Sequence, residues 1–345
     1  MRAWLFVPIA ALSGALTITN PAAAATTKDF GVNLRGSSQG QLATTATRQS
    51  MLNAKAAGVN TVTLVYPHCQ ANAGSSAMYA CPTTPSDQTL RTAIHNARGL
   101  GLKVAVTVHQ EATSGTWSGY FCPTDRTAWF VNYRAMLVRL GSLLQSEHVQ
   151  EFIMGSEMPC LTMDSRSVGS TSRWRALIQA TRRVYTAQLS YSAQRESSYA
   201  PLSELDHIAF WDALTFIGSS AYYPLSDAGS VTKLRQQWDH IEATSYAPLV
   251  ARWHRKVLIT EVGYRSITGA SVAPYDYKKT GPLDLGEQAR AYTALLGMVH
   301  DSSIIAGVQL WEWSANPNAG GPQDRNYTPQ RKPAQAVMKR LMVQA

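Results

Sequence analysis

Two glutamates in this chain stand where an apolar segment ends. A carboxylate at such a position needs an interaction partner or a function. Glu261 follows the apolar run in "KVLITEVGYRS" (256–266), and Glu157 closes a similar run in "FIMGSEM" (152–158). An ionised carboxylate is costly to remove from water unless it is paired or used. Each glutamate is therefore a candidate salt-bridge partner, an acid facing water at the start of a loop, or a catalytic group.

As a pair, Glu157 and Glu261 suit the cleavage of a glycosidic bond. Two carboxyl groups about 5 Å apart perform retaining hydrolysis: one attacks the anomeric carbon, and the other donates a proton to the leaving oxygen and later activates water. Burial and the like charge nearby would separate their pKa values. The two glutamates are 104 positions apart in sequence (261 − 157), so the fold has to bring them together.

The elements that could do so follow from the hydropathy pattern, in which short β-rich runs alternate with stretches of helical spacing. The predicted strands are 30–36, 59–69, 102–111, 149–158, 187–194, 215–225, 256–266 and 304–314. The predicted helices are 45–58, 86–101, 124–147, 170–186, 205–214, 230–255, 284–300 and 332–344. Ser86 is expected to cap the second helix, and glycines are expected to end the first two.

Eight strands that are each followed by a helix predict an α/β fold with a parallel sheet, closed as a single-domain (β/α)8 TIM barrel. A doubly wound open sheet is the alternative. No GxGxxG follows the first strand, which argues against a dinucleotide site. In a closed barrel the active site lies at the C-terminal ends of the strands.

Polar and aromatic residues gather at those predicted strand ends. They are Asn33, Arg35, Tyr66, His68, His109, Glu111, Tyr222, Tyr223, Trp311 and Glu312. Trp311 offers an indole to the apolar face of a sugar, and Tyr222 could hydrogen-bond the nucleophile. Arg35, Asn33, His68 and His109 could bind hydroxyl groups or keep the carboxylates charged. The alternatives are structural histidines, a core tryptophan, and rim acids at Glu111 and Glu312.

The N-terminus has the form of a secretory signal peptide. Residues 1–25 carry a basic Arg2, an apolar stretch too short to span a membrane, and a run of small residues. We therefore expect a catalytic domain over 26–345 and a protein secreted to the periplasm or the medium. Four cysteines, Cys69, Cys81, Cys122 and Cys160, suit two disulfides in an exported chain. Three pairings are possible, and we favour Cys69–Cys81 with Cys122–Cys160.

Composition and motifs argue against other classes of protein. The formal net charge is +9, but the basic residues are scattered and no nucleic-acid motif accompanies them, so no nucleic acid is expected as a partner. The chain has no CxxC or HExxH, so we expect neither a metal nor a cofactor. We expect no membrane insertion and a monomer that acts on a polysaccharide or oligosaccharide.

Several segments resemble glycoside hydrolase family 113, the β-mannanases. They are "ITEVGYRSITGASVAPYDY" (259–277), "FIMGSEM", "FIGSSAYYPL" (216–225), "DLGEQARAY" (284–292) and "LWEWSANPNAGGPQDRNYTPQRKPA" (310–334). The resemblance implies endo-acting, retaining cleavage of β-1,4-linked mannose units. It gives Glu157 the acid/base role and Glu261 the nucleophile role. It also places Trp311, Tyr222, His109, Asn33 and Arg35 around the central sugar.

One departure from the wider group of such glycosidases is visible. The residue before the acid is usually Asn, which contacts the sugar 2-hydroxyl, whereas this chain has Ser156. The sugar therefore stays open, with a β-glucan, xylan or galactan as alternatives to mannan. Two further hypotheses are a carbohydrate-binding barrel without turnover, and a metal hydrolase built on His68 and His109.

Overall fold

The computed structural model describes residues 28–195, 203–225 and 229–342, so the predicted signal peptide lies outside the described residues. Eight parallel strands form a ring in it: β1 (Asp29–Arg35), β2 (Thr61–Gln70), β4 (Lys103–Ala112), β5 (Glu151–Ser156), β6 (Gln188–Gln194), β7 (Ile217–Ser220), β8 (Val257–Val262) and β9 (Ile305–Ser314). Because β1 pairs with both β9 and β2, the ring is closed. The predicted barrel is confirmed, and the open doubly wound sheet was wrong.

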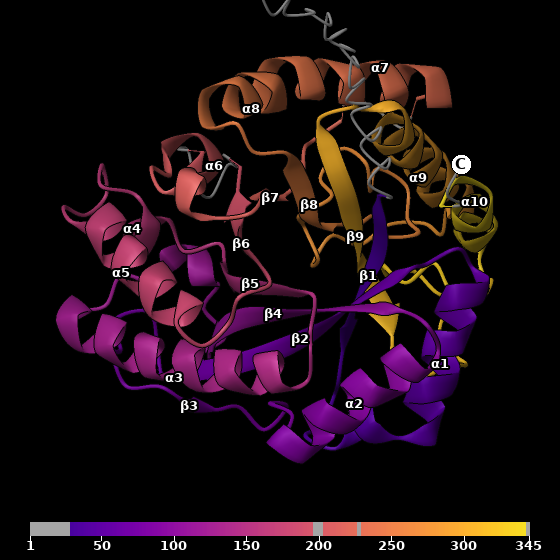
Figure 1. Cartoon of the computed structure of the whole chain (residues 1–345). Helices are drawn as coiled ribbons and strands as arrows, with labels where there is room; N and C mark the ends of the chain where they lie inside the picture. Colours follow the sequence, from indigo (N-terminus) through magenta and orange to yellow (C-terminus); the bar gives the residue numbers. More distant parts are fainter. Residues whose placement is uncertain (1–27, 196–202, 226–228, 343–345) are drawn as a thin grey trace, which may run out of the picture.

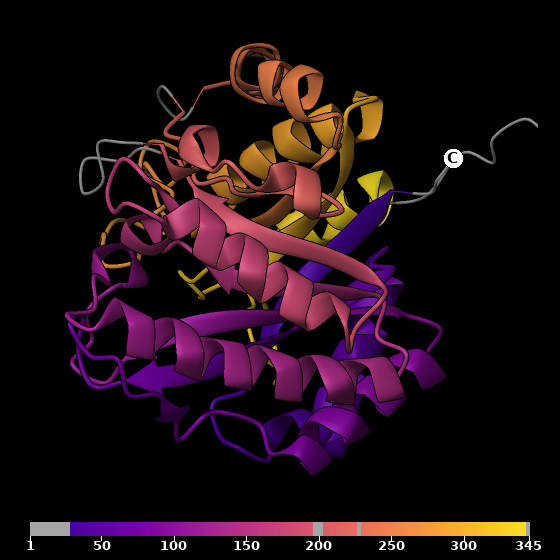
Figure 2. The same ribbon diagram turned by 60° about the vertical axis from the view of Figure 1, so that its left-hand side comes forward.

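Helices surround the strands on the outside, as Figures 1 and 2 show. They are α1 (Thr45–Ala56), α2 (Asp87–Gly99), α3 (Arg126–Ser146), α4 (Pro159–Thr162), α5 (Ser170–Arg182), α6 (Glu204–His207), α7 (Val231–Ile241), α8 (Ala247–Trp253), α9 (Leu285–Asp301) and α10 (Pro333–Leu341). Short 3₁₀ turns are η1 (Gln41–Ala43), η2 (Ser118–Tyr120) and η3 (Trp211–Ala213). Among the described residues, no helix is both long and apolar enough to cross a membrane.

The predicted helix ends follow ordinary capping chemistry. The Ser86 side chain accepts the backbone N–H of Thr89 and begins α2, as predicted. Gly58 and Gly101 come just after α1 and α2 with φ of 93° and 74°, a left-handed conformation that glycine adopts without a Cβ clash.

The structure differs from the predicted elements in several places. The expected helix over 205–214 is a short α6 followed by η3, and the expected strand over 215–225 pairs only within β7. A two-residue strand β3 (Tyr79–Ala80) runs antiparallel to β2. The expected helix over 230–255 is divided by a π-helical turn, η4 (Glu242–Tyr246), just before Pro248. Proline lacks an N–H for the regular helical bond, which accounts for a break at this point.

Side chains on each strand alternate between the barrel interior and the surrounding helices. Inside, Thr63 Oγ1 donates to Gln309 Oε1 at 2.8 Å, and Asn33 Nδ2 donates to the Gln309 carbonyl at 3.3 Å. Gly31 leaves room for Gln309, because a Cβ there would lie 1.6 Å from Gln309 Oε1. On the other side of β2, Val62 and Leu64 are fully buried in the layer beneath the helices.

Both disulfides form in the pairing favoured above. Cys69 at the end of β2 joins Cys81 just after β3, and Cys122 in the loop after η2 joins Cys160 in α4. Each bond therefore fixes a loop at the same end of the barrel as the ends of β2 and β5. Loops at that end carry the catalytic and binding residues of this fold.

Candidate active site

A cavity of about 1040 Å³ opens at the C-terminal ends of the strands. Six of the residues predicted from the sequence line it: Arg35, His109, Glu157, Tyr222, Glu261 and Trp311. They come from β1, β4, the end of β5, the segment after β7, β8 and β9. The barrel therefore brings both glutamates and most of their predicted neighbours to one mouth.

Glu157 stands directly after β5 in a backbone conformation that is unusual for its type. Its φ is 53°, in the left-handed region, and its N–H donates to the Ser192 carbonyl on β6 at 2.9 Å. Its carboxylate accepts two donors, Ser220 Oγ to Oε1 at 2.5 Å and Trp117 Nε1 to Oε2 at 2.6 Å. Strained residues persist only where their surroundings hold them, and they gather at functional sites.

Glu261 enters the same cavity from β8. Tyr222 donates its hydroxyl to Glu261 Oε1 at 2.7 Å, and His109 Nε2 lies 3.5 Å from Oε2. Ser220, which donates to Glu157, is the cross-strand neighbour of Glu261 in the β7–β8 register. A single residue of β7 therefore lies between the two acids.

Burial raises the pKa of both acids. For Glu157 this effect is opposed by the hydrogen bonds from Ser220 and Trp117. For Glu261 burial is joined by the negative charge of Glu157, and both outweigh the opposing hydrogen bond from Tyr222 and the charge of Arg35. Two close buried carboxylates cannot both ionise readily, so they titrate as a unit.

His109 is a neutral neighbour of Glu261. Burial, together with the positive charge of Arg35, lowers the pKa of His109 to about 3. The contact between His109 and Glu261 is therefore not an ion pair at neutral pH. The imidazole stacks on Trp311 with ring centroids 5.3 Å apart and planes 7° from parallel, which fixes the orientation of the indole at the cavity wall.

Arg35 and Glu111 form an ion pair at 2.8 Å on the cavity rim, with side chains 33% and 28% exposed. Glu312 also lines the cavity, and burial raises its pKa against the charge of Arg35. The expected rim positions of Glu111 and Glu312 match this arrangement. Arg35 adds positive potential near Glu261, and its charge lowers the pKa of that acid.

Three residues expected to bind substrate do not line the cavity. Tyr66 and His68 have the parity of Leu64 and face the helices: Tyr66 OH accepts from Arg139 Nη2 of α3 at 2.6 Å, and His68 Nδ1 lies 3.4 Å from Gln110 Oε1. Asn33 does point inward but is only 1% exposed, and its amide donates to the Thr260 carbonyl at 3.1 Å beneath the site.

Sequence reasoning missed several residues that line the cavity, most of them on loops. Trp117 and Ser220 hydrogen-bond Glu157, and both lie outside the strand-end positions considered above. Other cavity residues come mainly from loops: Tyr120, Arg195, Arg265, Tyr275, Asp276, Tyr277, Lys278, Asn326 and Tyr327. The only available signal was the aromatic content of "TSGTWSGY" (113–120) and "APYDY" (273–277).

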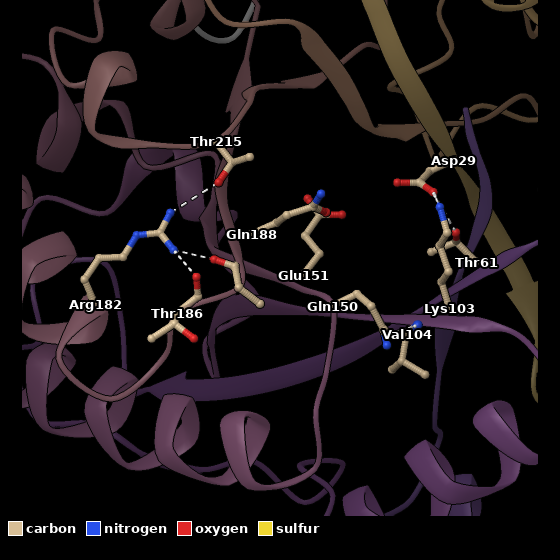
Figure 3. Close-up of a pocket in the computed structure, with 11 residues that line it drawn as sticks. Asp29, Thr61, Lys103, Val104, Gln150, Glu151, Arg182, Thr186, Gln188 and Thr215 are labelled. Atoms are coloured by element: carbon tan, nitrogen blue, oxygen red, sulfur yellow. Dashed lines mark hydrogen bonds and ion pairs between the residues drawn. The ribbon is translucent and has the colours of Figure 1, made fainter. Parts of the chain in front are cut away.

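A second cavity, of about 750 Å³, lies at the opposite end of the barrel (Figure 3). It is lined by the first residues of five strands, Asp29, Thr61, Lys103, Glu151 and Gln188, and by residues of the adjoining loops. Figure 3 shows Lys103 paired with Asp29 on one side and Arg182 bonded to Thr215 on the other. None of its lining residues is aromatic, so it offers no platform for a sugar ring.

The chain resembles known glycosidases over nearly its whole length. Glycoside Hydrolase Family 113 matches residues 30–332. A GH113 β-1,4-mannanase in a complex superposes with a TM-score of 0.78 at 23% identity, over 92% of this chain and 98% of the other. The GH113 β-mannanase AaManA from Alicyclobacillus acidocaldarius, bound to ManMIm, gives 0.77 at 26% identity, with 92% and 98% covered.

A more distant structure has the same fold. A β-glucuronidase from Ruminococcus gnavus gives a TM-score of 0.60 at 11% identity, over 92% of this chain and 50% of the other. No curated protein is significantly similar in sequence. The family match covers far more than half of the chain and agrees with the closed barrel and the two acids at its mouth. The chain therefore belongs to Glycoside Hydrolase Family 113 and is a glycoside hydrolase.

Proposed function

We propose that this protein is an endo-acting β-1,4-mannanase that cleaves mannan or glucomannan with retention of configuration. The observation that carries the proposal is the pair Glu157 and Glu261, which share one cavity with Trp311. The GH113 neighbours whose names state mannanase activity support the choice of sugar.

In the first step, a Glu261 oxygen attacks the anomeric carbon and the bond from that carbon to the leaving oxygen breaks. Glu157 gives its proton to the leaving oxygen, and the shortened chain departs with a free hydroxyl. The product is a glycosyl ester of Glu261. Tyr222, which donates to Glu261 in the free protein, keeps the attacking carboxylate in one orientation.

In the second step, Glu157 acts as a base. It takes a proton from a water molecule whose oxygen attacks the same anomeric carbon, and the ester bond to Glu261 breaks. Two inversions restore the original configuration, and Glu157 regains the proton it gave away. No cofactor takes part in either step.

Both acids have raised pKa values in the free protein. Burial and the charges of Glu157 and Glu312 raise the pKa of Glu261 to about 8, against the hydrogen bond from Tyr222 and the charge of Arg35. Burial raises the pKa of Glu157 against its hydrogen bonds from Ser220 and Trp117. Glu261 must lose its proton before it attacks, and the division of roles between the two acids is the one that the family resemblance implies.

The residue before Glu157 bears on the identity of the sugar. Ser156, 5% exposed, lines the cavity next to Glu157. Its side chain is shorter than the asparagine usual at this position, so we expect more room beside the sugar 2-hydroxyl. An axial hydroxyl, as in mannose, suits that space. A β-glucan, xylan or galactan substrate is the alternative, and a carbohydrate-binding barrel without turnover would show binding but no products.

A substrate panel with matched variants tests the function. Wild type, Glu261→Gly, Glu157→Ala and the control Glu151→Gln are incubated with mannan, β-glucan, xylan and galactan, and products are separated by thin-layer chromatography. Wild type and the control should release oligosaccharides from mannan, and both active-site variants should lose at least 10³-fold in kcat. Full activity of Glu261→Gly would contradict the mechanism.

Azide distinguishes the two roles. With an activated aryl mannoside, azide should rescue Glu157→Ala as the β-glycosyl azide, because it attacks the glycosyl-enzyme. It should rescue Glu261→Gly as the α-glycosyl azide, because it attacks the sugar directly. Proton NMR of the anomeric centre separates the two products, and the reverse outcome would exchange the roles.

We also propose that the protein is secreted and monomeric. The two disulfides agree with an oxidising compartment. Expression with residues 1–25 should yield a mature N-terminus near residue 26 in the periplasm or medium, read by Edman degradation. Light scattering should give the mass of one chain; a cytoplasmic, unprocessed product or a dimer mass would contradict these points.

A further inference from the structure

Glu204 is a buried carboxylate on α6 that the proposed chemistry does not use. Its exposure is 0%, and four donors converge on it. Thr162 Oγ1, Tyr191 OH and the Met158 N–H donate to Oε1 at 2.5, 2.7 and 3.2 Å, and the Gln194 N–H donates to Oε2 at 3.0 Å. An unpaired buried carboxylate is expensive, so this set of donors indicates a specific role.

The donors come from the segments that surround Glu157. Met158 is the next residue in the chain, Thr162 ends α4, and Gln194 ends β6. The Met158 N–H is shared with the Tyr191 hydroxyl at 2.8 Å, so Tyr191 and Glu204 hold it together. Glu204 therefore ties the turn that follows the acid to the neighbouring strand.

The turn at Glu157–Met158 has a strained backbone. Glu157 has φ of 53°, and its own N–H is bonded to Ser192 on β6. A non-glycine residue in this region costs about 1 kcal/mol or more and relaxes when its surroundings no longer hold it. If the Met158 N–H were released, the peptide between Glu157 and Met158 could rotate, and the carboxyl group would move with it.

We propose that Glu204 is a positioning residue that holds the turn at Glu157–Met158, so that the Glu157 carboxyl reaches the leaving oxygen. The inference rests on the proposed acid/base role of Glu157. Glu204 does not touch the substrate, and it acts through the backbone of Met158 and through Thr162. Burial raises the pKa of Glu204 to about 7 against its hydrogen bonds, and the charge of Glu157 adds to that rise.

Glu204→Gln keeps the size of the side chain but replaces one acceptor oxygen with a donor. The matched control is Glu151→Gln, a carboxyl 2% exposed at the start of β5, the strand that ends next to Glu157. Two aryl β-mannobiosides are compared by kcat/KM, which reports the first step. The 4-methylphenyl substrate needs a proton for its leaving group, and the 2,4-dinitrophenyl substrate does not.

We expect Glu204→Gln to lose about 30-fold in kcat/KM with the 4-methylphenyl substrate and less than threefold with the dinitrophenyl substrate. The control should stay within twofold of wild type with both. Equal losses on the two substrates, or no loss on either, would overturn the inference. If wild type cleaves neither substrate nor mannan, the proposed function fails instead, and the two failures are thus distinguishable.

A second variant covers the case in which Glu204→Gln does not fold. Tyr191→Phe removes the hydroxyl that joins the Met158 N–H to Glu204 and leaves the carboxylate in place. It should show the same dependence on leaving group, with a loss of about tenfold on the 4-methylphenyl substrate. A loss equal for both substrates would count against the positioning role.

Discussion

The Cys122–Cys160 disulfide joins the two segments that make one hydrogen bond at the active site. Cys160 lies three residues after Glu157, and Cys122 lies five residues after Trp117, whose indole N–H donates to Glu157 at 2.6 Å. We predict that removing this disulfide, as Cys122→Ser/Cys160→Ser, lowers turnover as well as stability. Removing Cys69–Cys81 in the same way should lower stability with little effect on turnover.

The expected loss of stability follows from the lengths of the two disulfide loops, and the expected loss of turnover follows from one hydrogen bond. The bridges span 38 and 12 residues, and loop-closure entropy assigns them roughly 4 and roughly 3 kcal/mol of unfolding free energy. At roughly 2 °C per kcal/mol for a domain of this size, Tm should fall by roughly 8 °C and roughly 6 °C. A hydrogen bond to a charged group contributes about 1.5–3 kcal/mol, so its partial loss should lower kcat about tenfold.

The assay is a double-mutant cycle at 25 °C in non-reducing buffer, with folding confirmed by circular dichroism. Trp117→Phe alone should lower kcat 10- to 100-fold, because the indole N–H is lost. If the disulfide acts through Trp117, adding Cys122→Ser/Cys160→Ser to that variant should lower kcat less than twofold further. A tenfold loss that persists in the Trp117→Phe background, or an equal loss on removing Cys69–Cys81, would refute this reasoning.

Three further predictions concern the carboxyl groups. Tyr222→Phe should lower kcat/KM 10- to 100-fold and raise the pKa of Glu261, moving the acid limb of the kcat/KM–pH profile to higher pH; an unchanged profile would contradict it. The pair of glutamates should lose its last proton near pH 8, the value to which the pKa of Glu261 is raised. Glu157→Gln removes the like charge and should therefore lower the pKa of Glu261. A titration followed by ¹³C NMR of the carboxyl groups would measure both values. Burial raises the pKa of Glu151 to about 8, with Asp29 adding to it and Lys103 opposing. From about pH 4.5 to 8 the folded state therefore keeps a proton on Glu151 that the unfolded state loses, and this group lowers the free energy of unfolding by about 1.4 kcal/mol per pH unit. In denaturant titrations the pH slope of Glu151→Gln should be shallower than that of wild type by this amount, and equal slopes would contradict the prediction.

The strand–helix alternation made the barrel predictable, because each apolar run is short and flanked by amphipathic spacing. The same pattern placed Glu157 and Glu261 at strand ends, where a closed barrel gathers them. The alternation of side chains along a strand also limits which residues can line the cavity. Thr63 faces the interior, so Tyr66 and His68, an odd number of residues away, face the helices.

The roles of residues on loops and helices could not be predicted from the sequence, for a different reason. Trp117 bonds Glu157 from the loop that carries η2 and Cys122, and the path of that loop does not follow from local spacing. Glu204 stands in "SELDHIAF" (203–210), which has the composition of an exposed helix start. Its burial depends on donors from Thr162 and Gln194 on other elements, which is tertiary information.

The restraints on Glu157 come from both sides of the barrel wall, and this explains how a strained residue can stay in place. On the cavity side, Trp117 and Ser220 bind its two carboxylate oxygens. On the helix side, Glu204 binds the next backbone N–H. A left-handed backbone at a non-glycine residue persists only when such contacts exceed its cost. Losing one contact should therefore leave the fold intact while the acid moves, so activity with poor leaving groups should respond before stability does.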